Sequence, residues 1–255
     1  MEQSNSRGLI TPLIILDKDG TLIAFESMWH TWFRRFLRHL LDQGCLSLQA
    51  RMGLAGTLGF DPVDLDDWDP DGPLTLASTG EVLLLAASQL YACQGMSWEQ
   101  ALSRVQAAEV HARATLDDPE LLTTVGDVAA TLQLLRDGGH VLALATTDTR
   151  ASTTRHLEIL GLASYFSAVV CGDDGIPLKP APDMALEICR RLGFAPEQAV
   201  MVGDSSFDML MAHRAGLARA IGVSSGSMPA ERLAPFADLV IADIHRLVDV
   251  DGGSE

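Results

Sequence analysis

Apolar and polar residues alternate along residues 127–243 in a pattern that switches regularly between helix and strand periodicity. Stretches of about a dozen residues closed by glycine predict four helices. Short apolar runs between them predict strands. The expected helices are 127–139, 149–161, 182–193 and 205–216, and the expected strands are 140–148, 167–175, 198–204, 217–223 and 237–243. A further run, "LIIL" at residues 13–16, predicts a strand buried on both faces. Strands separated by helices imply an α/β fold with a doubly wound parallel sheet.

Residues 25–122 do not follow this alternation and read as mainly helical. Within them, Trp29, Trp32, Phe33 and Phe36 fall on one face of an amphipathic helix, and arginines fall on the other face. The expected helices are 28–44, 80–95 and 97–116. Because the first strand precedes this block and the other strands follow it, we expect a helical domain at 25–122. It would be inserted into a sheet domain of residues 1–24 and 123–255.

Composition and charge exclude several classes of function. The chain has 255 residues, a formal net charge of -16 and 47% hydrophobic residues, so a large core is expected but no general basic surface for nucleic acid or anionic membranes. The N-terminus lacks the pattern of a signal peptide, and no apolar run is long enough to span a membrane. The four cysteines are scattered, which favours reduced thiols and a cytoplasmic location. The sequence leaves open whether the protein is a monomer or a homodimer.

Polar side chains follow four of the expected strands or the loops after them. Asp17 and Asp19 follow the first strand. The expected strand 140–148 ends with Thr146 and Thr147. The loop after the expected strand 167–175 contains Lys179, and the expected strand 198–204 ends with Asp204, which Asp208 follows one helical turn later. Each has an ordinary explanation by itself, such as a strand residue, a surface lysine, or a helix cap at Asp204 or Ser205. Parallel strands, however, bring their carboxyl ends to one edge of the sheet. Clustered carboxylates suit Mg²⁺, and a lysine with hydroxyls beside it suits a phosphoryl group.

An acidic stretch in the helical block has a second possible interpretation. In "DLDDWDPDG", Asp67, Asp69, Asp71 and Gly72 have the opening spacing of a calcium-binding loop. The twelfth position of such a loop should be glutamate, and Ser78 stands there. A solvated acidic loop is therefore the favoured interpretation over a calcium site.

The motifs "DKDGTL", "ATTD", "KPAPD" and "VGDSSFD" together resemble those of the haloacid dehalogenase-like (HAD) hydrolase superfamily, and more narrowly its phosphoglycolate phosphatase-like branch. The resemblance covers the expected sheet domain, and that branch carries a cap domain where this chain has its helical block. It implies a Rossmann-like core and hydrolysis of a small phosphate monoester with Mg²⁺. A second aspartate in the first motif distinguishes phosphatases of this superfamily from its dehalogenases, and Asp19 occupies that position.

The resemblance also implies roles for individual residues. Asp17 would be the nucleophile that forms an aspartyl-phosphate, and Asp19 would be the general acid and base. The metal would be held by Asp17, Asp204 and the backbone carbonyl of Asp19. Thr146, Thr147 and Lys179 would bind the phosphoryl oxygens. Asp208 and Ser205 would lie behind them, with Asp208 orienting Lys179 or a metal-bound water.

The choice of substrate is less determined. The resemblance implies a phosphoglycolate-like ester or a sugar phosphate as the substrate. Ala24 and Phe25 replace the Asp-Ser or Asp-Thr that usually follows the first motif in this branch, so the resemblance does not single out phosphoglycolate itself. Glu26, His30 and Arg34 fall early enough in the first helix of the block to reach the substrate, although a solvated helix face is the plainer explanation for His30 and Arg34. Two other functions remain as alternatives. One is a phosphomutase of the β-phosphoglucomutase type, and the other is a non-catalytic binding protein on the same fold.

Overall fold

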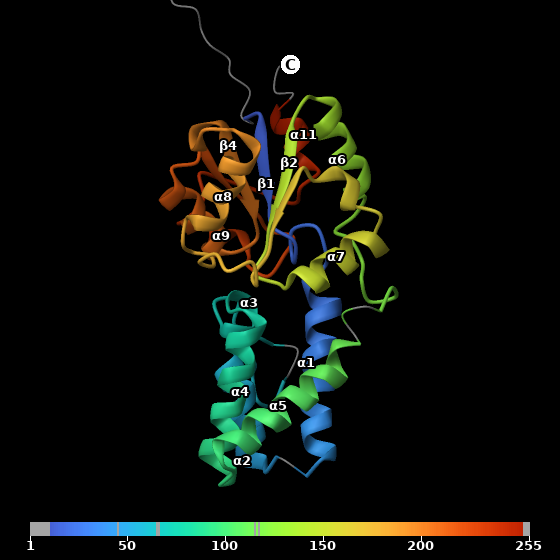
Figure 1. Ribbon diagram of the computed structural model, residues 1–255, viewed down its shortest axis with the longest axis vertical. Helices are drawn as coiled ribbons and strands as arrows, with labels where there is room; N and C mark the ends of the chain where they lie inside the picture. The colour runs from blue at the N-terminus through green and yellow to red at the C-terminus, as the bar shows by residue number, and fades with distance from the viewer. Residues whose placement is uncertain (1–10, 45, 65–66, 115, 117, 252–255) are drawn as a thin grey trace, which may run out of the picture.

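The computed structural model describes residues 11–44, 46–64, 67–114, 116 and 118–251. Six parallel strands form one sheet in the order β3-β2-β1-β4-β5-β6 (Figure 1). The strands are β1 (Leu13–Leu16), β2 (Val141–Ala145), β3 (Ala168–Val170), β4 (Ala199–Gly203), β5 (Arg219–Val223) and β6 (Leu239–Ile241). The α/β fold with a parallel sheet is confirmed, and every strand expected from the sequence is present.

Helices cover both faces of this sheet. In the sheet region they are α6 (Val128–Asp137), α7 (Arg150–Ile159), α8 (Asp183–Leu192), α9 (Ser206–Ala215), α10 (Ala230–Leu233) and α11 (Arg246–Asp251). Ala163–Tyr165 and Pro196–Gln198 form short 3-10 helices. Helices α8 and α9 lie on one face, and α6, α7 and α11 lie on the other (Figure 1). The short helices α10 and α11 were not predicted from the sequence.

Strand β1 is the centre of the core, and its side chains alternate between the two faces. Leu13 and Ile15 pack with residues of α8 and α9, whereas Ile14 and Leu16 pack with those of α6, α7 and α11. All four are fully buried, and each such side chain stabilises the fold by about 1.5–3 kcal/mol relative to exposure. If the alternation continues past the strand end, Asp17 faces α8 and α9, and the next residue, Lys18, faces α7.

Residues 25–122 form a group of helices below the sheet, which we call the helical region (Figure 1). Its helices are α1 (Phe25–Asp42), α2 (Leu48–Leu58), α3 (Pro73–Leu76), α4 (Thr79–Gln94) and α5 (Trp98–Arg113). The aromatic face of α1 is buried, with Phe33 stacked on Phe60 at 4.1 Å between ring centroids. Helices α2 and α3 were not predicted. Ser78 begins α4 as the helix cap of a capping box with Glu81.

The chain leaves the sheet region and returns to it through two adjacent segments. The Ala24 N–H donates to the carbonyl of Thr123 at 2.9 Å, and the Val125 N–H donates to the carbonyl of Leu22 at 3.0 Å. Ile23 and Thr124 form an isolated antiparallel bridge between these hydrogen bonds. The domain boundaries at 25 and 122 stay a prediction, but the crossing occurs next to them.

Three further expectations concern surface and composition. Within the described residues, none of the helices has both the length and the apolar composition that crossing a bilayer requires. Cys93, Cys171 and Cys189 are free thiols, and Cys45 lies outside the described residues. Asp69 and Asp71 are exposed and pair with Arg232 of α10, an arrangement that fits a solvated acidic loop.

Candidate functional site

Lys179 joins two buried carboxylates at the carboxyl edge of the sheet. Asp17 follows β1 and faces α8 and α9, as the alternation of β1 predicts. The Lys179 ammonium donates to Oδ1 of Asp17 and to Oδ1 of Asp208, both at 2.6 Å. Asp208 is held in turn by Ser205, whose hydroxyl donates to Oδ2 of Asp208 at 2.6 Å. This capping box of α9 fixes Asp208, and Asp208 thereby orients Lys179 toward Asp17.

Asp204 occupies a tight pocket made by backbone. Its Oδ2 accepts hydrogen bonds from both the backbone N–H and the hydroxyl of Ser227, each at 2.7 Å. A Cβ atom added at Gly20 would lie 2.0 Å from that same oxygen, and one added at Gly226 would lie 2.3 Å from it. Both positions therefore need glycine, because side-chain atoms cannot approach so closely. The chain around Gly20, immediately after Asp19, packs directly on the Asp204 carboxylate.

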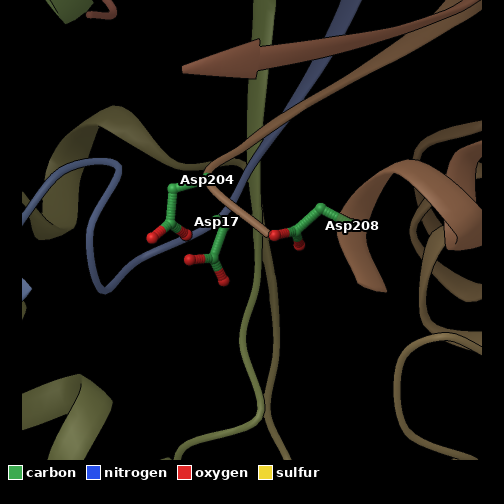
Figure 2. Close-up of side chains that lie close together, drawn as sticks. All are labelled: Asp17, Asp204 and Asp208. Carbon is green, nitrogen blue, oxygen red and sulfur yellow. The ribbon is translucent and has the colours of Figure 1, made fainter. Parts of the chain in front are cut away.

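Asp17, Asp204 and Asp208 form a buried group of carboxylates (Figure 2). They offer ligand oxygens within 4.8 Å of one another. Three ionised carboxylates outnumber the single Lys179 ammonium by two charges, which is the charge of a divalent cation. Oxygen donors are the ligands that Mg²⁺ prefers, and buried charges require a partner. The donor set therefore fits a hard divalent metal.

The pKa values of this group show the same excess of negative charge. Burial, followed by the charge of Asp208, raises the pKa of Asp204 to about 7. Burial raises the pKa of Asp17 well above its usual value, and Lys179 only partly offsets that effect. Burial opposes the charged form of Lys179, yet Asp17 and Asp208 outweigh it and raise the lysine pKa. Lys179 is therefore charged, while Asp17 and Asp204 resist ionisation until a further cation balances their charge.

We expect the stability of the metal-free protein to fall as pH rises from about 4 to about 7. The folded pKa of Asp204, about 7, lies above the unfolded value of about 4, so the folded state keeps a proton that the unfolded chain has already released. That advantage is complete below the unfolded pKa and is lost as pH passes the folded pKa. Mg²⁺ should therefore raise the melting temperature more at about pH 8 than at about pH 5.

Calorimetry of the wild type and of Asp204→Asn, each with and without Mg²⁺, tests this expectation. The variant has no carboxylate to titrate at that position, so it should keep only the part of the pH dependence that comes from Asp17 and should lose most of the response to Mg²⁺. A Mg²⁺-induced shift of equal size at both pH values would contradict it.

Gly226→Ala should weaken Mg²⁺ binding, because the added methyl group would displace Asp204 from its pocket. The Mg²⁺ concentration for half-maximal thermal stabilisation should rise by about tenfold or more. Gly56→Ala in α2 is the matched control: its methyl group would meet open space, and alanine favours the helix by up to about 1 kcal/mol. Unchanged Mg²⁺ affinity in Gly226→Ala would refute this role for the pocket.

Asp19 is held by a second buried lysine that sequence reasoning did not single out. Lys18 faces α7, as the alternation of β1 predicts, and is fully buried. Its ammonium lies 2.9 Å from Oδ1 of Asp19, 2.8 Å from Oδ2 of Asp148 and 3.0 Å from Nδ1 of His156. An ammonium has three donors, so each of these atoms accepts one, and His156 is neutral with its proton on Nε2.

The charge on this second lysine is secured by its partners. Burial opposes the ammonium form of Lys18, but Asp148 and Asp19 outweigh it and raise the lysine pKa. Burial likewise opposes the carboxylate of Asp148, and Lys18 outweighs it and lowers the pKa of Asp148. The sequence did contain a signal for this lysine, because Lys18 continues a buried strand and lies between Asp17 and Asp19. Its partner Asp148, however, lies 130 residues away along the chain.

An enclosed cavity of about 50 Å³ lies between these residues and the helical region. Asp17, Asp19, Lys179 and Asp204 line it from the sheet side. Thr146 and Thr147, at the end of β2, line it as well. The Thr146 hydroxyl accepts a hydrogen bond from the Asp148 N–H at 3.2 Å, and this bond stabilises the turn that follows β2. The structure thus brings together all the core residues named from the sequence, including Ser205 and Asp208.

The three residues expected to select the substrate behave differently. His30 is buried, with its ring 4.4 Å from that of Trp68 and 5.7 Å from that of Phe60, so the interpretation of a solvated face was wrong for it. Arg34 is exposed on α1. Neither is among the described residues that line the cavity. The Glu26 side chain lies outside the described part of the structure. The helical region instead contributes mainly apolar residues, among them Trp29, Trp32 and Leu76, together with two threonines, Thr75 and Thr79.

Comparisons with known proteins agree with this arrangement. Residues 11–216 match the family model described as haloacid dehalogenase-like hydrolase. The chain is 33% identical over 232 residues to probable phosphatase IndB of Dickeya dadantii (strain 3937), covering 91% of this chain and 89% of the relative. It is 43% identical over 89 residues to phosphoglycolate phosphatase of Escherichia coli (strain K12), covering 35% of each. A predicted phosphoglycolate phosphatase from Haemophilus somnus 129PT has a similar fold, with a TM-score of 0.68 at 20% identity over 94% of this chain and 97% of that one.

Proposed function

The chain belongs to the haloacid dehalogenase-like hydrolases and is an enzyme of their phosphatase type, and we propose that it hydrolyses a small phosphate monoester through an aspartyl-phosphate, with Mg²⁺. The observation that carries this proposal is the convergence of Asp17, Asp19, Lys179 and Asp204 on one enclosed cavity. The carboxylates of Asp17 and Asp19 lie in different environments beside Lys179. Phosphoryl transfer needs such a set, because one carboxylate can attack phosphorus, the other can transfer protons and the lysine can stabilise negative charge.

Asp17 is the nucleophile in this proposal. One of its carboxylate oxygens attacks phosphorus, the bond from phosphorus to the ester oxygen breaks, and the phosphoryl group is carried on Asp17. A water molecule then attacks the same phosphorus, the bond to Asp17 breaks, and inorganic phosphate is released. The 2.6 Å hydrogen bond from Lys179 fixes the orientation of the Asp17 carboxylate.

Asp19 transfers the protons in both steps. It protonates the leaving alcohol oxygen in the first step and takes a proton from the attacking water in the second. Oδ1 of Asp19 accepts from Lys18, so Oδ2 is the oxygen assigned to carry the proton. Lys18 thereby acts as a positioning residue for the acid and base.

The metal is assigned to Asp17, Asp204 and the backbone carbonyl of Asp19. The close packing of Gly20 on Asp204 supports this set, because it brings the chain at Asp19 next to that carboxylate. Asp208 belongs to the same carboxylate group but is already engaged by Lys179 and Ser205, so we assign it to orienting Lys179. When bound, Mg²⁺ reduces the repulsion between the anionic nucleophile and the anionic phosphate.

Thr146, Thr147 and Lys179 are assigned to the phosphoryl oxygens. They lie on the side of the cavity formed by the ends of β2 and the loop before α8. The helical region, residues 25–122, is proposed as a cap domain, since its residues close the cavity from the other side. A cap excludes bulk water from the phosphoryl group during attack.

Phosphate release from phenyl phosphate, glucose 6-phosphate and 2-phosphoglycolate, with Mg²⁺ and with EDTA, tests the proposal. We expect release that requires Mg²⁺, together with a hydroxylamine-sensitive phosphoryl group on the protein. Isomerised sugar phosphate in place of free phosphate would identify a phosphomutase instead. No release by a protein whose melting temperature responds to Mg²⁺ would indicate a non-catalytic binding protein.

A further inference from the structure

A second, larger cavity opens beside the enclosed one, between the helical region and the sheet region. It is a groove of about 770 Å³. An apolar cavity of about 150 Å³ is enough to hold benzene, so the groove has room for a ring-sized or larger group. Figure 1 shows α3 at the end of the helical region nearest α9. The residues that line the groove come from α3, α4 and the start of α5 on one side and from the segment around Lys179 and Phe207 on the other.

The groove is continuous with the proposed phosphate site. The two cavities share five lining residues, and these come from both regions of the chain. They are Leu76, Ala77, Thr147, Lys179 and Phe207. A molecule whose phosphoryl group lies against Lys179 and Thr147 can therefore extend directly into the groove. The group that extends there is the alcohol part of the phosphate ester.

The groove surface is mainly apolar and partly exposed. Leu84 of α4 is 51% exposed and Trp98 of α5 is 45% exposed, and both line it. Large apolar side chains gathered on an exposed concave surface are typical of ligand sites. Pro180 and Phe207 complete an apolar wall on the sheet side.

Among the described residues that line either cavity, Lys179 is the only cation, and it already pairs with Asp17 and Asp208. A carboxylate on the leaving alcohol, as in phosphoglycolate, would find no cation of its own. The groove instead carries the acidic residues Asp71 and Glu81. A second negative charge on the substrate is therefore disfavoured.

The polar side chains of the groove are also engaged within the protein. Asp71 pairs with Arg232. Oε2 of Glu81 accepts from both the N–H and the hydroxyl of Ser78 at 2.8 Å. The hydroxyl of Ser88 donates to the carbonyl of Leu84 at 2.7 Å. Within the groove itself, few polar side chains are left to recognise the many hydroxyls of a sugar.

Resting on the function proposed above, we propose that the substrate is a monophosphate ester of an uncharged, largely apolar alcohol, and that Leu84 and Trp98 bind this alcohol in the groove. The phosphoryl group occupies the enclosed cavity and the apolar group lies between α4, α5 and the loop at Pro180. Specificity is set by the apolar surface and by the lack of a second cation among the described residues that line the two cavities.

The test compares two esters that differ by one charge, phenyl phosphate and 4-carboxyphenyl phosphate. Wild-type kcat/KM should be higher for phenyl phosphate by about tenfold or more, mainly through KM. The carboxylate makes the phenol a somewhat better leaving group, so the chemistry alone would favour the opposite order. Leu84→Arg should bring the two values close together or reverse them, because it supplies a cation in the groove.

Two further variants control for general effects. Leu134→Arg places the same cation on an equally exposed leucine of α6, which is not among the groove residues, and should leave the ratio unchanged. Trp98→Ala should raise KM for phenyl phosphate with little change in kcat. Equal wild-type values for both esters, or a ratio that Leu84→Arg does not move, would overturn the proposal.

A binding measurement separates this inference from the proposed function. Calorimetry with Mg²⁺ should show benzylphosphonate binding about tenfold or more tightly than phosphonoacetate, and Leu84→Arg should remove the difference. If neither ester is hydrolysed but this preference holds, the proposed function fails and the groove assignment stands. If esters are hydrolysed but phosphonoacetate binds as tightly, the groove assignment fails alone.

Discussion

Replacing Asp17 with asparagine should lower kcat for phosphate release by about 10⁴-fold or more. The amide oxygen of asparagine can still accept the hydrogen bond from Lys179, so the local structure should persist. An amide is nevertheless a very poor nucleophile toward phosphorus, and no aspartyl-phosphate can form. Steady-state assays with saturating Mg²⁺ and phenyl phosphate measure the loss.

Thermal unfolding provides the internal control for this variant. The pKa of Asp17 is raised by burial, so its carboxylate destabilises the metal-free fold when ionised. Asp17→Asn should therefore match or exceed the wild type in melting temperature at about pH 8 without metal. If the variant loses its activity but keeps the melting temperature of the wild type, the loss is caused by the missing nucleophile and not by unfolding. Retention of more than about one per cent of wild-type activity would exclude Asp17 as the nucleophile.

Replacing Lys18 with methionine should destabilise the protein by about 3–5 kcal/mol, because Asp148 would be left buried without its partner. It should also lower kcat by about 10- to 100-fold, since Asp19 would lose the hydrogen bond that fixes its carboxylate. Denaturant unfolding and phosphate release measure the two effects separately.

The double variant Lys18→Met with Asp148→Asn tells the two effects apart. Removing both charges should recover much of the lost stability, because the unpaired buried carboxylate is gone. The asparagine can still accept the Thr149 N–H that Asp148 accepts at 2.7 Å. Activity should stay low, since nothing holds Asp19. Full recovery of kcat in the double variant would show that Lys18 supports the fold and has no role in positioning the acid.

The sheet and its four longest helices, α6 to α9, could be predicted because their periodicity is local. Each strand expected after residue 127 is present, since a buried parallel strand needs a continuous apolar run and little else. Helix α2 (Leu48–Leu58) could not be predicted in the same way. Its sequence contains Gly53 and Gly56 and has no separate polar and apolar faces, so its helical form depends on packing against α4.

The core of the site could be inferred for a geometric reason. Parallel strands bring their ends to one edge, so residues after β1, β2 and β4 meet without any knowledge of side-chain contacts. The contacts of Lys18 with Asp148 and His156 could not be inferred in this way, because they depend on which residue of α7 faces the sheet. His30 was misjudged for a similar reason: residues near 60 and 68 cover that face of α1, and nothing near His30 in the sequence indicates them.

The paired crossing at Ala24 and Thr123 makes the helical region exchangeable. The chain leaves and re-enters the sheet region at two residues joined by a hydrogen bond, so no strand pairing depends on what lies between them. Another segment with equally close ends could replace the described helices α1 to α5 and leave Asp17, Lys179 and Asp204 in place. Preference for a new alcohol could then be acquired by grafting one continuous stretch of chain, while the groups assigned to phosphoryl transfer are inherited unchanged.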